Sequence, residues 1–155
     1  MDDFRTSINV RIPFQDDYIY LLGVATYCFS YYEGTIVDIL SVIEKDFRQK
    51  YYRKSAMTSG QLAQQFKDYL PHHLDIIGLS ECHSDFAKMV DIRNRLIHGH
   101  PITDPTEGQI LNYQASTKKE ISDYKWTYNR IKDFILEIDS CVSTAAKLLD
   151  RLQNT

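Results

Sequence analysis

The chain has 155 residues, of which 43% are hydrophobic and 25% are charged, and its formal net charge is −3 at pH 7. These values are ordinary for one globular domain and exclude both a long disordered region and an overall positive field that would attract nucleic acid or a membrane. No run reaches the roughly 18 apolar residues of a membrane span, and the opening residues lack the pattern of a signal peptide. We therefore expect a single domain over residues 1–155, located in the cytoplasm.

Residues 1–15 predict an irregular lead-in, and a long helix is predicted from Asp16 to about Tyr51. Its apolar residues recur at intervals of three and four, and Glu33 is the only charge between Asp17 and Asp38. A helix that is apolar around its circumference needs cover on more than one side, which a partner subunit would supply. Glu33 is either an exposed residue or the neutralising partner of a cation inside the bundle, with Arg93 as the first choice.

The last part of this helix is basic and aromatic. Its cations are Lys45, Arg48, Lys50, Arg53 and Lys54, against the single acid Asp46, and Phe47, Tyr51 and Tyr52 lie between them. Cations follow phosphates and aromatic rings stack on bases, so the segment is a candidate RNA-binding surface. A solvated helix end, with cations near the negative end of the helix dipole, is the other interpretation.

A short helix from Gly60 to Tyr69 is predicted next, with Thr58 or Ser59 as its N-cap and Pro71 after its end. A further helix begins near Ser80 or Ser84. Its inward stripe contains Phe86, Met89, Val90, Arg93, Leu96 and Ile97. Arg93 stands where a hydrophobic residue is expected, and a buried guanidinium requires partners.

Residues 100–126 hold Pro101, Pro105 and Gly108 and predict an irregular loop, with a short hairpin around Ile110–Lys125 as a further option. The final helix is clearer, because its apolar residues from Ile131 to Leu152 keep a near-heptad rhythm. The sequence thus predicts an all-α fold, an up-and-down bundle of four to five helices.

The chemistry gathers at the end of the third predicted helix, which Gly99 and Pro101 terminate. Asn94 and His98 are four residues apart and share one face, with Arg93 at its border. A histidine exchanges protons near neutral pH, and an arginine fork matches a phosphate. Arg93, Asn94 and His98 are therefore candidate catalytic residues for RNA cleavage without a metal. Arg95 and His100 are candidate RNA contacts beside them.

A structural interpretation competes with this one. Arginine and histidine near a helix C-terminus interact favourably with its dipole and its free carbonyls. Asp91 and Arg95 are four residues apart and would form an ordinary surface ion pair. On this interpretation the chain is a helical interaction protein.

The run Arg93-Asn94-Arg95-Leu96-Ile97-His98-Gly99 resembles the Arg-x4-His signature, often beginning Arg-Asn, of the HEPN (higher eukaryote and prokaryote nucleotide-binding) superfamily. The resemblance implies an all-α homodimer whose two motifs meet in one cleft. In active members it implies metal-independent RNA cleavage, often in toxin–antitoxin or antiviral defence systems, with Arg93 and His98 catalytic and Asn94 supporting. It equally implies an alternative, a catalytically silent module that binds RNA, a nucleotide or a protein partner.

The family also suggests a partner for this chain. Members paired with a nucleotidyltransferase antitoxin commonly carry tyrosine two residues after the histidine, and here that position is His100. An antitoxin or nucleotidyltransferase partner therefore remains an expectation from the family alone.

No metal or cofactor is expected from the other polar residues. His72, His73, Asp75, Glu81, Cys82 and His83 lie close in sequence, but adjacent pairs do not fit the separated ligands of structural zinc sites. Three cysteines far apart, Cys28, Cys82 and Cys141, predict free thiols.

Overall fold

The computed structural model describes residues 15–53, 57–116 and 121–154, so residues 1–14 of the lead-in predicted for residues 1–15 lie outside the described residues. Within these ranges the chain forms, in order, α2 (Asp16–Ile43), α3 (Phe47–Tyr52), α4 (Ser59–Tyr69), the 3-10 turn η1 (Leu70–His72), α5 (Leu79–Ile97), β1 (His100–Asp104), β2 (Gly108–Ser116), β3 (Ile121–Trp126) and α6 (Tyr128–Gln153).

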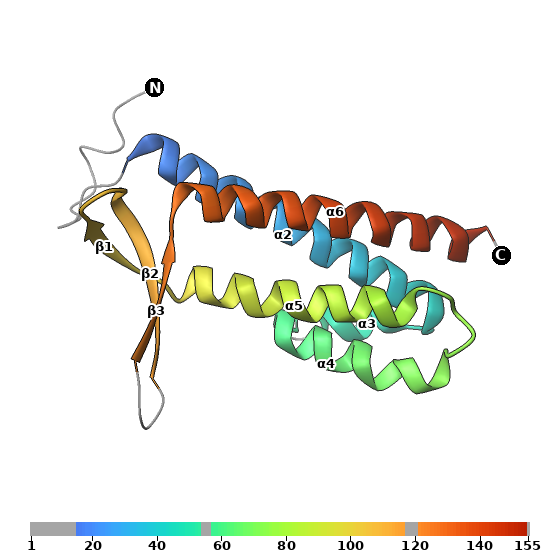
Figure 1. Ribbon diagram of the computed structural model, residues 1–155. Helices are drawn as coiled ribbons and strands as arrows, with labels where there is room; N and C mark the ends of the chain where they lie inside the picture. The colour runs from blue at the N-terminus through green and yellow to red at the C-terminus, as the bar shows by residue number, and fades with distance from the viewer. Residues whose placement is uncertain (1–14, 54–56, 117–120, 155) are drawn as a thin grey trace.

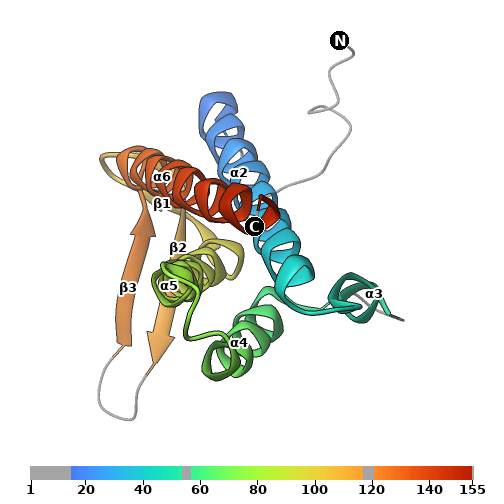
Figure 2. The same ribbon diagram turned by 90° about the vertical axis from the view of Figure 1, so that its right-hand side faces the viewer.

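Three long helices build the body of the molecule. Figure 1 shows α2 and α6 side by side, both running away from the end that carries the strands, while α5 runs back toward it. The end-on view in Figure 2 places α4 against α5, and α3 at the far end of α2. Because α2 and α6 run in the same direction, the bundle is not of the simple up-and-down kind.

The prediction of an all-α fold is wrong, because residues 100–126 form a three-stranded antiparallel sheet in the order β1-β2-β3. The sheet pairs His100 with Asn112 and Asn112 with Lys125, so one rung crosses all three strands. A buried turn residue, Asp104, accepts backbone N–H groups from Thr106 and Glu107 and closes the β1–β2 turn. The short hairpin predicted as an option around Ile110–Lys125 thus corresponds to β2 and β3 of a larger sheet.

The sheet joins the helices through one side chain and one large ring. The Tyr18 hydroxyl donates to the Trp126 carbonyl at 2.7 Å and accepts the Leu111 N–H at 2.8 Å, so it bridges the end of the β2–β3 ladder. Trp126 is fully buried and packs edge-on against Phe134 of α6. Burial of Tyr18 raises its pKa, which keeps the bridging hydroxyl protonated.

The first predicted helix is divided in two. α2 ends at Ile43, and Asp46 adopts a left-handed conformation with φ of 64° before α3 begins. That turn folds α3 back, so that Phe47 and Tyr51 enter the core. α4 matches its prediction more closely: Thr58 is the N-cap, and its hydroxyl and the Gln61 side chain form a reciprocal capping box.

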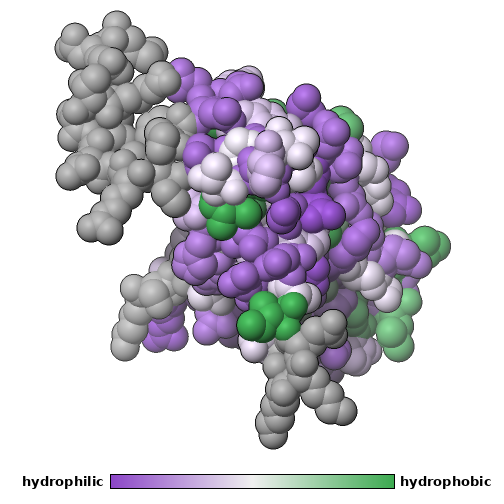
Figure 3. Space-filling view, turned by 60° about the vertical axis from the view of Figure 1, so that its left-hand side comes forward, coloured by the Kyte–Doolittle hydropathy of each residue, from purple (hydrophilic) through white to green (hydrophobic). Residues whose placement is uncertain are grey.

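The hydrophobic core lies between α2, α5 and α6. No helix in the described ranges is long and apolar enough to cross a membrane. Most of the face at the strand end of the molecule is hydrophilic, with a few separate hydrophobic patches (Figure 3).

One surface of α2 carries exposed aromatic side chains. Tyr20, Tyr27 and Tyr31 are 70%, 75% and 61% exposed.

Candidate functional site

The end of α5 lies at the junction between the helices and the sheet. His98 is the C-cap residue, with its backbone N–H bonded to the Asn94 carbonyl at 3.1 Å. Gly99 follows, and a Cβ added there would lie 3.1 Å from the Leu111 Cβ and 3.2 Å from the Leu96 carbonyl oxygen. Glycine therefore lets β2 approach the helix end closely, which fixes the position of the two histidines that flank it.

Arg93 is half-buried on the inner side of α5, as the apolar stripe predicts. Its guanidinium carbon lies 5.3 Å from the centre of the buried Phe29 ring of α2, in a cation–π contact. One terminal nitrogen of Arg93 donates to the Asn94 side-chain oxygen at 3.4 Å, a long bond. Among the described residues no carboxylate pairs with Arg93. The positive charge of Arg93 is thus held at the protein surface, where its guanidinium can bind an anion.

His98 is exposed at the end of the same helix. Five residues along an α-helix correspond to about 140° of rotation beyond one full turn, so Arg93 and His98 leave α5 on different sides. Within the described ranges no hydrogen bond joins the two side chains. The structure brings Arg93 together with Asn94, and it places Arg93 on a different side of the helix from His98 within one protomer.

The two predicted contacts beside the motif face opposite sides of the sheet. Arg95 is exposed, and its guanidinium lies 5.2 Å from the centre of the Tyr124 ring of β3. His100 begins β1, and its register with Asn112 places the two residues on the sheet face that also carries Asp104. Because residues alternate along a strand, Tyr124 and Asn112 lie on different faces.

The basic segment lies at the other end of the bundle from His98 (Figure 1). Arg48 forms an ion pair with Asp38. Lys50 donates to the Tyr69 hydroxyl at 3.2 Å and lies 5.7 Å from the centre of that ring. Lys54 lies outside the described residues. The segment is therefore a surface separate from the motif.

A wide, open pocket of about 740 Å³ adjoins this segment. It is lined by Glu44, Lys45, Asp46, Gln49, Lys50, Arg53 and Tyr69. Three cations and two carboxylates share its wall, so the charges partly cancel there. This balance makes it a weaker phosphate site than the sequence of cations suggests.

Glu33 contacts hydroxyl groups. Its carboxylate accepts a hydrogen bond from the Tyr51 hydroxyl at 2.9 Å and another from the Ser59 hydroxyl. Burial first, and the bond to Glu33 second, raise the pKa of Tyr51. No ion pair between Glu33 and Arg93 forms in the described parts of the chain, so Glu33 holds α3 and α4 against α2.

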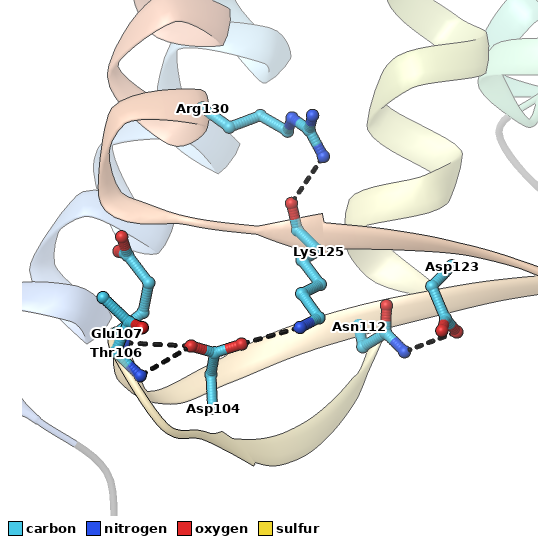
Figure 4. Close-up of polar contacts among 7 residues, drawn as sticks. All are labelled: Asp104, Thr106, Glu107, Asn112, Asp123, Lys125 and Arg130. Atoms are coloured by element: carbon cyan, nitrogen blue, oxygen red, sulfur yellow. Dashed lines mark hydrogen bonds and ion pairs between the residues drawn. The ribbon is translucent and has the colours of Figure 1, made fainter.

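A polar network on the sheet was missed at the sequence level. Asp104 pairs with Lys125 at 2.8 Å, and Asp123 accepts the Asn112 amide at 3.0 Å (Figure 4). The bond from Lys125 and the two turn N–H groups lower the pKa of Asp104 to about 2. The run Asp-Pro-Thr-Glu-Gly from Asp104 to Gly108 was its local signal, since aspartate and glycine favour such turns.

The remaining histidines and the cysteines have different surroundings. His73 bonds Glu44 at 2.8 Å, while His83 stacks edge-on against Phe66, and burial lowers the pKa of His83. Within residues 15–53, 57–116 and 121–154, no group of three or more histidine, cysteine, aspartate or glutamate side chains is placed to hold a metal ion. All three cysteines are free thiols, and burial raises the pKa of Cys82 to about 12.

Comparison with known proteins adds no relative to these observations. A scan against protein-family models gave no match, a search of curated proteins gave none, and a search of solved structures gave none.

Proposed function

We propose that the chain is a metal-independent endoribonuclease whose chemistry is carried by Arg93 and His98 at the end of α5, with Asn94 in support. The observation that carries the proposal is the half-buried guanidinium of Arg93. It rests on Phe29 and has no carboxylate partner in the described residues, while an exposed imidazole ends the same helix. A desolvated cation of this kind is stabilised by an anionic ligand, and a phosphodiester fits a guanidinium fork.

The reaction requires a base, an acid and positive charge. A neutral imidazole removes the proton of an RNA 2′-hydroxyl, the 2′-oxygen attacks phosphorus, and the bond to the 5′-oxygen breaks. A protonated imidazole gives its proton to the leaving 5′-oxygen, leaving a 2′,3′-cyclic phosphate and a free 5′-hydroxyl. Arg93 offsets the negative charge on the oxygens of the crowded phosphate, and His98 supplies the proton transfers.

A single protomer offers only one such imidazole, on a different side of the helix from Arg93. A two-fold homodimer would place two copies of each group in one furrow, so that one histidine acts as base and the other as acid. The exposed Tyr20, Tyr27 and Tyr31 give α2 an aromatic surface typical of an interface. The resemblance of the motif to the HEPN superfamily supports the same dimer and a role as a toxin or a defence component.

The test is the cleavage of a fluorescently labelled single-stranded RNA in excess EDTA. We expect His98→Ala to slow cleavage by roughly 10²- to 10⁴-fold, because a general acid–base contributes that much. Arg93→Ala should also lose cleavage. His72→Ala, at an exposed histidine on η1, is the matched control and should cut like the wild type. Equal rates in all four proteins would refute the proposal.

A second function has one observation in its favour. Because Arg93 and His98 do not meet within a protomer, the same groups suit an RNA-binding module that does not cut. Such a module would bind RNA with an affinity that falls in Arg93→Ala, and it would leave the RNA intact over the whole assay.

A further inference from the structure

A pocket on the sheet, next to the motif, has a composition suited to a nucleotide. It is lined by Arg95, Tyr113, Ala115, Ser122, Asp123 and Tyr124, has a volume of about 320 Å³, and is called the Tyr124 pocket below. The volume lies at the lower end of the range of small-molecule sites.

The walls of the Tyr124 pocket are aromatic side chains, and its floor is made of small side chains. Tyr113 pairs with Tyr124 across β2 and β3, and Ala115 pairs with Ser122 one rung further along the same sheet face. Two rings therefore stand beside a shallow floor on which a planar base has room to lie.

Positive charge concentrates at this pocket. The guanidinium carbons of Arg95 and Arg130 lie 5.2 Å and 4.2 Å from the centre of the Tyr124 ring. Arg130 donates to the Lys125 carbonyl at 2.7 Å, and in the described residues neither arginine has a carboxylate partner. Two unneutralised guanidiniums beside one ring favour an anionic ligand.

The carboxylate in the lining is turned away. Asp123 pairs in register with Gln114, so its side chain lies on the sheet face opposite to Tyr124. There it accepts the amides of Asn112 and Gln114 at 3.0 Å and 2.9 Å. Figure 4 shows the Arg130 guanidinium on one side of β3 and the Asp104 and Asn112 side chains on the other.

We propose that the Tyr124 pocket binds one nucleotide of single-stranded RNA, with the base against Tyr113 and Tyr124 and the adjoining phosphate on Arg95. Arg130 adds charge and fixes the Tyr124 ring from α6. Arg95 is three residues before His98, so the two share a side of α5. The pocket therefore receives a nucleotide adjoining the phosphate that His98 acts on, and in this respect the inference rests on the proposed function.

The experiment measures binding without cleavage, using the full chain and a 2′-O-methyl tetranucleotide that lacks the attacking hydroxyl. Trp126 is the only tryptophan, and its ring centre lies 5.3 Å from that of Tyr124, so its emission reports occupancy of the pocket. Tyr113→Ala and Ala115→Phe, which fills the floor, should each weaken binding by roughly 5- to 150-fold, the loss of one stacked base.

The remaining arms separate charge from stacking. Arg95→Gln should reduce the salt slope of binding by about 0.7, the value for one phosphate on a single strand. Tyr113→Phe keeps the ring and should bind like the wild type, as should Lys147→Gln at an exposed position of α6. Circular dichroism checks that each variant is folded.

Two results would overturn the inference: failure of the wild type to bind the tetranucleotide, or unchanged binding of the tetranucleotide in both Tyr113→Ala and Ala115→Phe. Failure of the proposed function is distinguishable from these results. A protein that binds the tetranucleotide through Tyr113 but never cuts natural RNA keeps the pocket and loses the nuclease.

Discussion

The guanidinium of Arg93 lies over the ring of Phe29, with 5.3 Å between the guanidinium carbon and the ring centre. Arg93 is the only charged residue in the inward stripe of α5, and Phe29 is a buried residue of α2. Phe29 also stacks on Phe86, at 6.3 Å between ring centres, so the surface under Arg93 is held by the core. The cation is thereby positioned without a carboxylate, which leaves its charge available.

Phe29→Leu tests this arrangement. The substitution removes the ring face below Arg93 and should lower the free energy of unfolding by about 1–3 kcal/mol, from lost packing and the lost cation–π contact. It should also slow RNA cleavage, because Arg93 is no longer held. The matched control is Phe134→Leu, at a buried phenylalanine that contacts Trp126. Urea denaturation should show a similar loss in both, whereas only Phe29→Leu should slow cleavage; an equal effect on cleavage would contradict the positioning role.

Asp104 makes stability depend on pH in the acid range. Its pKa is lowered to about 2 in the folded chain, whereas an unfolded aspartate titrates near roughly 4. A lowered folded pKa stabilises the native state above the unfolded pKa, and this stabilisation is lost as the pH falls from about 4 to about 2. The melting temperature of Asp104→Asn should therefore lie below that of the wild type at pH 7. The difference between the two melting temperatures should be smaller at pH 2.

The control for this prediction is Asp133→Asn, at an exposed position of α6. Thermal unfolding at pH 7 and pH 2, followed by circular dichroism, gives both values. If the gap between Asp104→Asn and the wild type were the same at the two pH values, the ion pair with Lys125 would not be the cause.

Glu33 is expected to act in stability and not in cleavage. Glu33→Ala leaves the hydroxyls of Tyr51 and Ser59, both on buried residues, without their acceptor. The loss should be about 1–3 kcal/mol of unfolding free energy. Glu81→Ala, at an exposed position in the first turn of α5, should change stability little. Denaturant titration distinguishes them, and a loss of cleavage at unchanged stability would assign Glu33 to the reaction.

The aromatic surface of α2 predicts the oligomeric state. Tyr27 and Tyr31 are one helical turn apart and both are exposed, so charges introduced there should repel across a two-fold interface. The double variant Tyr27→Glu/Tyr31→Glu should be monomeric by sedimentation and lose RNA cleavage. Lys132→Glu on α6 is the control for added charge. A double variant that stays dimeric would exclude this face as the interface.

The sequence predicted the helices well where each pattern was local. The N-cap at Thr58 and the heptad-like rhythm of α6 are read from neighbouring residues, and Arg93 stands out because it interrupts an apolar stripe. The break before α3 was missed because Asp46 reaches its left-handed conformation without a glycine or proline to mark it.

The sheet was missed for a different reason. Its strands are short, and part of what holds them comes from distant residues. Tyr18 bridges Leu111 and Trp126 from the start of α2, and Trp126 packs on Phe134. Strand preference depends on such packing more than helix preference does. His100 begins β1 and so belongs to the sheet, whereas His98 is the C-cap residue of α5.

The chemistry of the new RNA ends decides whether Arg93 and His98 cleave RNA without a metal. Purified protein is incubated with single-stranded RNA in excess EDTA, and the new 3′ ends are identified by mass spectrometry. We predict 2′,3′-cyclic phosphates for the wild type and uncut RNA for Arg93→Ala and His98→Ala. Ends that carry a 3′-hydroxyl, or cyclic phosphates formed equally by both variants, would contradict it.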